Sequence, residues 1–213
     1  RSTLSNNSAG FGGGLFSNGS TTFTDSVVSG NQATVSDGGG IANASGGNLQ
    51  FISSTLAGNS AFDDAGGLLN ASGGTAVLRG STVSANTVGD VGGGIGNNGS
   101  LTLENSTVSG NSADTVGGGI QSYTGSITLT NATVTGNRAD ANGNATGTGG
   151  GVFHQLSVVS INNSIIAGNL VGAGTAASDL VGFAALNNAT NQHNLIGDAG
   201  SANGLTDGSN GNI

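Results

Sequence analysis

Several residue types are missing from this 213-residue chain, and each absence excludes a kind of chemistry. The chain has no cysteine, so disulfides and thiolate metal sites are excluded. Proline, methionine and tryptophan are also absent, and Arg1, Arg79 and Arg138 are the only Lys or Arg residues. No apolar run approaches the roughly 20 residues that a membrane-spanning helix needs. We therefore expect no membrane span.

The charge of the chain is strongly one-sided. Its formal net charge is -8, with only three basic side chains besides two histidines. Nucleic acids and anionic membranes are bound through clusters of Lys and Arg, so we expect no nucleic-acid partner. A surface of Ser, Thr, Asn and Gly is typical of secreted repeat proteins. The composition therefore indicates an extracellular or cell-surface location.

What the chain does contain is a repeat. In the unit Gly99–Ile120, two alternating runs are followed by Gly110-Asn111 and then by a glycine triplet before Ile120. Similar boxes recur along the chain, and their last residues are Asn7, Asn31, Asn59, Asn86, Asn111, Asn137 and Asn169. These asparagines are 24 to 32 residues apart. A period in this range predicts a solenoid, in which each unit buries its apolar face against its neighbours.

The local pattern predicts which solenoid this is. Apolar residues alternate over three to five positions between turn residues, which is typical of strands, and 43 glycines oppose helix. Three strands per coil and about seven coils give an all-β parallel β-helix. Three inward columns are expected: Phe23, Phe51, Leu78, Leu103, Leu129 and Ile161; Leu4, Val28, Leu56, Val83, Val108, Val134 and Ile166; and Leu15, Ile41, Leu68, Ile95, Ile120 and Val152.

Polar residues recur at the predicted corners. The column between the second and third strands contains Asp25, Ser53, Gly80, Asn105, Asn131 and Asn163. Stacked amides can bond one another and the bent backbone. We therefore predict structural ladders that include Asn105, Asn131 and Asn163 and the closing asparagines Asn111, Asn137 and Asn169.

The repeat sets the expected domain organisation. Residues 1–197 form one β-helical domain, and residues 198–213 are a polar tail that serves as a partial cap or starts a further coil. Segments such as Gln32–Asp37 are interpreted as loops, and Arg138–Thr148 is a longer one. The first box begins at once, so we expect further chain or a stacked copy at the open coil end.

Acidic residues recur before the glycine triplets. They are Asp37, Asp64 (beside Asp63), Asp90 and Asp114. Carboxylates one coil apart repel unless they are solvated or bridged by a hard cation, so calcium at these four residues is a hypothesis. The alternative is that Asp simply starts a turn before glycine. No other cofactor is expected.

Catalytic residues are not predicted. Glycoside hydrolysis needs converging carboxylates, and Asp63-Asp64 is the only adjacent acidic pair. His154 and His193 have no acidic neighbour in sequence and are expected at the surface. The exposed aromatic candidates are scattered along the chain: Phe11, Phe16, Phe62, Tyr123, Phe153 and Phe183. We therefore expect no enzymatic activity.

The box and the glycine triplet together resemble a known group. The runs Leu101–Asn111 and Gly117–Ile120 are similar to the right-handed parallel β-helix repeats of bacterial surface and secreted proteins, including polymorphic outer-membrane proteins and adhesins. The resemblance covers residues 1 to about 197. It implies a right-handed coil and a surface or adhesive role, and it implies no catalytic residues.

Three functional hypotheses follow. The first is a structural or adhesive surface protein, a rigid stalk or a filament unit that assembles by end-to-end stacking. The second is a carbohydrate-active or glycan-binding β-helix. The third is an ice-binding solenoid, because outward Thr and Ser residues such as Thr82 and Thr107 form columns on one predicted sheet, although Val27 and Ile165 interrupt them.

Overall fold

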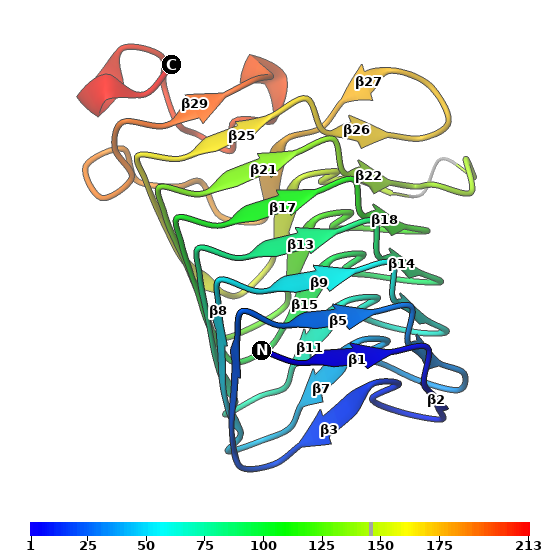
Figure 1. Ribbon diagram of the computed structural model, residues 1–213. Helices are drawn as coiled ribbons and strands as arrows, with labels where there is room; N and C mark the ends of the chain where they lie inside the picture. Colours follow the sequence, from blue (N-terminus) through cyan, green and yellow to red (C-terminus); the bar gives the residue numbers. More distant parts are fainter. Residues whose placement is uncertain (145–146) are drawn as a thin grey trace.

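A computed structural model describes residues 1–144 and 147–213, and the chain is an all-β parallel β-helix of about seven coils. The first and last coils lie at opposite ends of the stack (Figure 1). Part of the predicted loop Arg138–Thr148, residues 145 and 146, lies outside the described residues. The predicted fold class is confirmed.

Four sheets run along the stack. Sheet A contains β1 (Thr3–Ser5), β5 (Val27–Ser29), β9 (Thr55–Ala57), β13 (Thr82–Ser84), β17 (Thr107–Ser109), β21 (Thr133–Thr135), β25 (Ile165–Ala167) and β29 (Leu195–Ile196). Sheet C contains β3 (Leu15–Ser17), β7 (Ile41–Asn43), β11 (Leu68–Asn70), β15 (Ile95–Asn97), β19 (Ile120–Ser122), β23 (Val152–His154) and β28 (Leu180–Gly182). Sheet D contains β4 (Ser20–Thr24), β8 (Asn48–Ile52), β12 (Thr75–Arg79), β16 (Ser100–Glu104), β20 (Ser126–Thr130) and β24 (Val158–Asn162).

Sheet B corrects the loop assignment. It contains β2 (Ser8–Ala9), β6 (Gln32–Ala33), β10 (Ser60–Ala61), β14 (Thr87–Val88), β18 (Ser112–Ala113), β22 (Arg138–Ala139), β26 (Leu170–Val171) and β27 (Ala176–Ala177). The segment Gln32–Asp37, expected to be a loop, therefore begins with a strand. Two residues are too few to show an alternating pattern, which is why sheet B could not be predicted from the sequence. The first six coils, β1 to β24, thus have three longer strands and one short strand each.

The predicted core columns are confirmed by the strand register. Val83 pairs with Val108, and Val108 pairs with Val134, so these valines lie one over the next. All three are 0% exposed. A column that sequence reasoning missed, Leu49, Ala76, Leu101 and Ile127, also faces inward from sheet D.

The corner before sheet A requires a left-handed backbone. The φ angles of Asp25, Ser53, Gly80, Asn105, Asn131 and Asn163 lie between 47° and 54°. Asn, Asp and Gly tolerate this conformation better than other residues, which explains their recurrence at this corner. The glycine triplets have a different cause. A Cβ on Gly93 would lie 2.4 Å from the carbonyl oxygen of Gly118, because neighbouring coils approach closely there.

Buried side-chain ladders bind the coils together. The closing asparagines form one: the Asn86 side chain donates to Asn111 Oδ1 (2.9 Å), Asn111 donates to Asn137 Oδ1 (2.9 Å), and Asn137 donates to Asn169 Oδ1 (2.9 Å). The corner asparagines form a more exposed set, in which Asn131 donates to Asn105.

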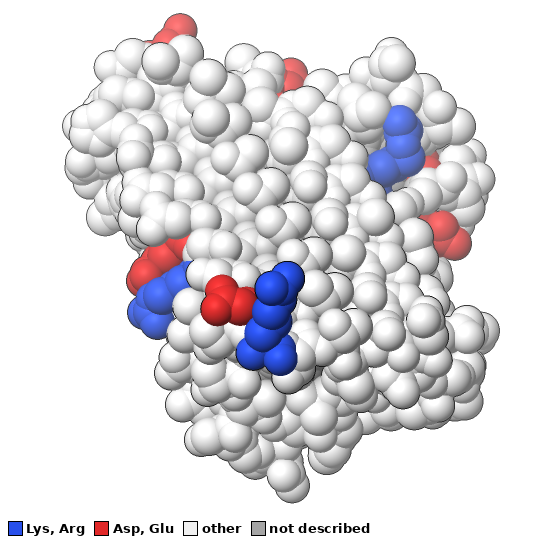
Figure 2. All heavy atoms as spheres, in the orientation of Figure 1, with Lys and Arg blue, Asp and Glu red and all other residues white. Residues whose placement is uncertain are grey.

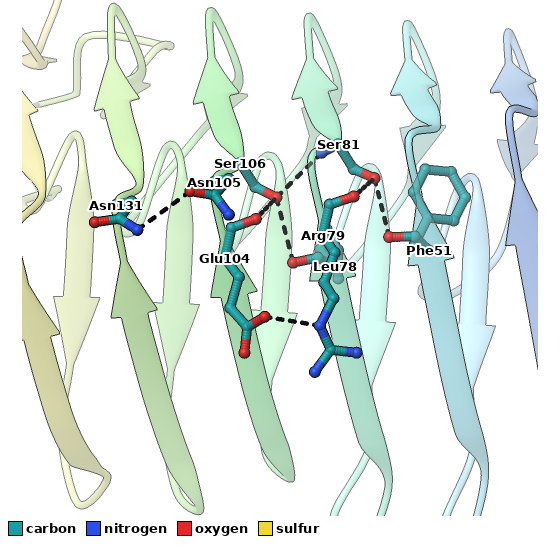
Figure 3. A network of polar contacts seen from close by, with 8 residues as sticks. All are labelled: Phe51, Leu78, Arg79, Ser81, Glu104, Asn105, Ser106 and Asn131. Atoms are coloured by element: carbon teal, nitrogen blue, oxygen red, sulfur yellow. Dashed lines mark hydrogen bonds and ion pairs between the residues drawn. The ribbon is translucent and has the colours of Figure 1, made fainter.

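Two further ladders were missed by sequence reasoning. In the first, the backbone N–H of Ser81 donates to Ser106 Oγ (3.1 Å), and that hydroxyl donates back to two carbonyls (Figure 3). In the second, the side chain of Asn43 donates to Asn70 Oδ1, and that of Asn70 donates to Asn97 Oδ1. Single Ser or Asn residues in a chain rich in both give no distinctive signal.

The last coil is covered by the residues that follow it. The 3₁₀ turns η1 (Ala199–Ser201) and η2 (Ser209–Gly211) lie in this segment. Ala202 and Leu205 are 7% and 8% exposed and join the main core. The backbone carbonyl of Ile213 accepts from the N–H of Ile196 on β29, and the N–H of Ile213 donates to the carbonyl of Asn194, just before that strand. The segment predicted to be a polar tail therefore packs on the core of the last coil.

We predict that Asn111→Ala lowers the free energy of unfolding by about 3 kcal/mol or more. The substitution leaves the backbone N–H of Asn86 and the carbonyl of Val83 without the partners that Asn111 supplies, and each unsatisfied buried group costs about 1–3 kcal/mol. Urea unfolding measures the change. The control is Asn48→Ala, an exposed asparagine on β8. Equal losses in the two variants would contradict a stabilising role for the ladder.

Candidate functional site

Three carboxylates converge on one edge of the solenoid. Asp63 and Asp64 lie between β10 and β11, and Asp90 lies between β14 and β15, one coil further along. One oxygen from each carboxylate lies within 4.8 Å of the others. Coil stacking creates this cluster, which we call the acidic trio.

The trio overlaps only partly with the predicted calcium residues. Asp64 and Asp90 belong to it, and Asp63 takes a place that the hypothesis did not assign. Asp37 lies beside it, since its Oδ1 accepts the backbone N–H of Asp64 (3.0 Å). Asp114 is not part of the trio. Carboxylate oxygens are ligands that calcium prefers, so the trio is the part of the predicted set that could hold a cation.

The carboxyl group of Asp64 is electrostatically strained. Desolvation by burial, together with the charges of Asp37, Asp63 and Asp90, raises its pKa from 3.8 to about 7, and a backbone hydrogen bond from Val91 opposes the shift. The carboxyl group of Asp64 is therefore only partly ionised near neutral pH. Asp90 has a different partner, because Thr115 donates its hydroxyl to Asp90 Oδ1 (2.6 Å).

A groove with a volume of about 360 Å³ begins at the trio and crosses the outer surface of sheet C. Its polar lining residues are Asp64, Asp90, Asn98, Gln121, Tyr123 and Gln155. Asp64 and Asp90 come from the segments before sheet C, and Asn98, Tyr123 and Gln155 from the turns after it. We call this the sheet C groove.

The aromatic residues are less scattered than the sequence suggested. Tyr123 and Phe153 both line the sheet C groove. The ring of Phe153 packs edge-on against Phe183, with centroids 5.9 Å apart. Tyr123, Phe153 and Phe183 follow one another at intervals of 30 positions in the sequence. Only the coil register could have predicted that they lie close together.

The arginines Arg79 and Arg138 lie away from the sheet C groove. Arg79 Nε contacts Glu104 Oε2 (2.7 Å) on the outer face of sheet D (Figure 3). Arg138 donates to the carbonyls of Gly172 and Gly174. Neither arginine lines the sheet C groove. The residues that line this groove therefore include no guanidinium of the kind that a lyase would place beside a bound acidic sugar.

The two histidines differ from each other. His154, expected at the surface, is only 1% exposed, because it lies in the buried column of Asn43, Asn70, Asn97 and Ser122 and is followed there by Gly182. Burial lowers its pKa, and its Nε2 lies 2.6 Å from Asn203 Nδ2. His193 is exposed as expected. Neither histidine is in the acidic trio.

The surface as a whole carries little charge. On the face shown in Figure 2, charged side chains are few. Some acidic and basic side chains lie next to each other, and uncharged surface separates these small groups. The outward threonines of sheet A lie in register, with Thr82 opposite Thr107 and Thr107 opposite Thr133, and Val27 and Ile165 interrupt the column as expected. Among the described residues, no helix has the length and apolarity needed to cross a membrane.

These features define the class of the chain as a parallel β-helical repeat protein with one acidic trio and an adjoining groove. Comparison with protein-family models, curated proteins and solved structures gives no match. The relationship to bacterial surface and secreted repeats therefore stays a prediction from the motifs.

We predict that Asp64→Asn stabilises the protein at about pH 8. The folded-state pKa is raised, so the wild type loses stability as the pH rises from 3.8 to about 7, and the variant avoids that loss. Because Asp64 is partly exposed and solvent screens its charge, we expect a gain in Tm of roughly 2–4 °C. The gain should vanish below the unfolded-state pKa. Thermal unfolding across this pH range measures it.

A control and a cation test complete this experiment. Asp25→Asn, at an exposed corner away from the trio, should change Tm little. Calcium bound at the trio should raise the Tm of the wild type at about pH 8 and raise that of Asp63→Asn less, because a ligand is lost. A pH-independent gain in Asp64→Asn would contradict the electrostatic account.

Proposed function

We propose that this chain is a structural or adhesive module of an extracellular or cell-surface protein, in which the β-helix serves as a rigid stalk. The observation that carries the proposal is the continuity of the buried ladders. The asparagine ladder runs from Asn7 to Asn169 and joins every coil to the next through side-chain hydrogen bonds. Such a chain resists bending and local opening between coils.

The surface supports the same role. About seven coils at about 4.8 Å each give a rod on the order of 34 Å long. Its sheets present mostly uncharged hydroxyl and amide side chains, which suit contact with water and with neutral surfaces. The only arginine–carboxylate pair that the described residues form, Arg79–Glu104, is exposed and contributes little stability.

The first coil offers a surface for self-association. Its strands β1, β3 and β4 are edge strands, and Leu4, Leu15 and Phe23 pack on the core while remaining only partly buried. A second copy placed there would pair backbone groups and cover these side chains. The opposite end is covered by Ala202 and Leu205, so continued filament growth would require displacement of that cover.

We predict that the protein associates through the first coil and that Phe23→Arg abolishes the association. A charge at this position opposes burial against another copy. Sedimentation velocity over a range of concentrations measures the effect. Val158→Arg is the matched control, because Val158 is an exposed apolar residue at the other end of the stack, on β24. A wild type that stays monomeric at every concentration would contradict self-association.

One observation favours a second candidate function, hydrolysis of a glycan. The acidic trio combines a carboxyl whose pKa is raised to about 7, Asp64, with a nearby carboxylate, Asp90. Glycosidases pair a protonated acid with an ionised carboxylate, and the two carboxyl groups of retaining enzymes lie about 5–5.5 Å apart. Asp64 would protonate the glycosidic oxygen as its bond to the anomeric carbon breaks, while Asp90 would attack that carbon and form a glycosyl-enzyme ester. Water, deprotonated by Asp64, would then displace Asp90 from the sugar and restore both carboxyl groups.

Under this second function, Asp90→Asn should lower the release of reducing ends from neutral oligosaccharides by about 10²-fold or more. Asp114→Asn, which changes a carboxylate outside the trio, should leave the rate unchanged. Reducing-sugar assays on cellohexaose, maltohexaose, mannohexaose and xylohexaose measure the rates. No release by the wild type would exclude hydrolysis of these substrates and leave the structural role as proposed.

A further inference from the structure

The sheet C groove lies over one part of the outward column of sheet C. In that column, Leu69 is followed by Gly96, then by Gln121 and Phe153. Ala65 covers Gly96, and the groove is lined by the next two residues of the column, Gln121 and Phe153. The groove volume of about 360 Å³ lies within the range of about 300–1,000 Å³ that is usual for small-molecule sites.

Gln121 is the unusual residue of this groove. Its side chain is 8% exposed, and it makes no hydrogen bond with any residue that the structure describes. Its amide atoms are not among the described polar atoms that are both fully buried and without a partner, so they are open to the groove. Because Gln121 lines the groove, its two donors and its acceptor are available to whatever occupies it.

A second polar atom in the groove is also unsatisfied. The Oδ1 atom of Asn98 is buried and has no hydrogen-bond partner among the described residues. Asn98 and Gln121 lie on successive coils, and both face the groove. Both residues thus line the same groove as the carboxylates of Asp64 and Asp90.

The chemistry of the lining restricts the ligand. No Lys or Arg lines the groove, and two carboxylates do, so an anionic ligand would be repelled. Amides and carboxylates suit a ligand that carries many hydroxyl groups, because each hydroxyl both donates and accepts. Tyr123, which is 51% exposed, offers an apolar ring face with a polar tip at the edge of the groove.

We propose that the sheet C groove binds a neutral oligosaccharide, with Gln121 and Asn98 bonding its hydroxyl groups, Asp64 and Asp90 accepting from them, and Tyr123 stacking on a sugar ring. This inference gives a ligand class to the adhesive part of the proposed function and rests on it. If the protein binds no sugar but still forms a stable rod, the proposed ligand is wrong and the proposed structural role stands.

The chain provides its own probe for this site. Tyr123 is the single tyrosine of a chain without tryptophan, so intrinsic tyrosine fluorescence reports on the groove alone. The wild type is titrated to millimolar concentrations with cellohexaose, maltohexaose, mannohexaose and xylohexaose, and with hexagalacturonate and spermine as charged probes. Calorimetry on the same samples gives Kd independently of the fluorophore.

Gln121→Ala is the test variant. Alanine should be tolerated, because Ala42 occupies the same outward column two coils before the position of Gly96. We expect at least one neutral hexasaccharide to change the fluorescence of the wild type and its Kd to weaken about tenfold in Gln121→Ala, which corresponds to the loss of about 1.4 kcal/mol. Tyr123→Ala, followed by calorimetry, should weaken binding as well.

Gln50→Ala is the matched control. Gln50 lies on the outer face of sheet D, so its loss should leave the Kd unchanged. The proposal is overturned if none of the four neutral sugars binds, if binding is equally strong in Gln121→Ala, or if only hexagalacturonate or spermine binds. Circular dichroism of each variant confirms that a lost response does not come from unfolding.

Discussion

The hydrogen bond from an asparagine side chain to its equivalent one coil away is the interaction on which the structure depends. In the closing column, each Oδ1 accepts from both the backbone and the side chain of the preceding asparagine, as Asn137 Oδ1 does from Asn111. The corner backbone is bent and cannot complete a regular ladder, so without these amides buried N–H groups would stay unpaired. The asparagine side chains thus supply at the corner the hydrogen bonds between coils that the strands supply between corners.

This constraint explains both the composition and the surface. A coil can stack closely only where its corners hold small or amide side chains and where triplets such as Gly92–Gly94 let backbones approach. Loops such as the one with Asp63 and Asp64 are free of that requirement, and they bring unlike residues of neighbouring coils together. The acidic trio and the sheet C groove both lie beside such loops, which is where solenoids commonly carry their binding function.

The sequence predicted the architecture well because stacking makes each column visible as a repeat. Phe51, Leu78 and Leu103 share a column that can be read without coordinates, and the register confirms it. Sheet B was not predicted because each of its strands has only two residues. The burial of His154 could not be predicted because its column changes from Asn to Ser and then to His. The groove could not be predicted because its lining residues do not repeat from coil to coil.

The acidic trio shows which side-chain positions the sequence repeat does not predict. The four aspartates before the glycine triplets look equivalent in sequence, yet the structure separates Asp114 from the others and adds Asp63. The repeat determines the coil to which a residue belongs, but local turns determine the positions of side chains in the loops. Asp64 therefore becomes the strained carboxyl because three acids surround it in one partly buried place. A site in a solenoid arises where the repeat is broken, and here the break at Asp63 and Asp64 lies next to the groove that Gln121 lines.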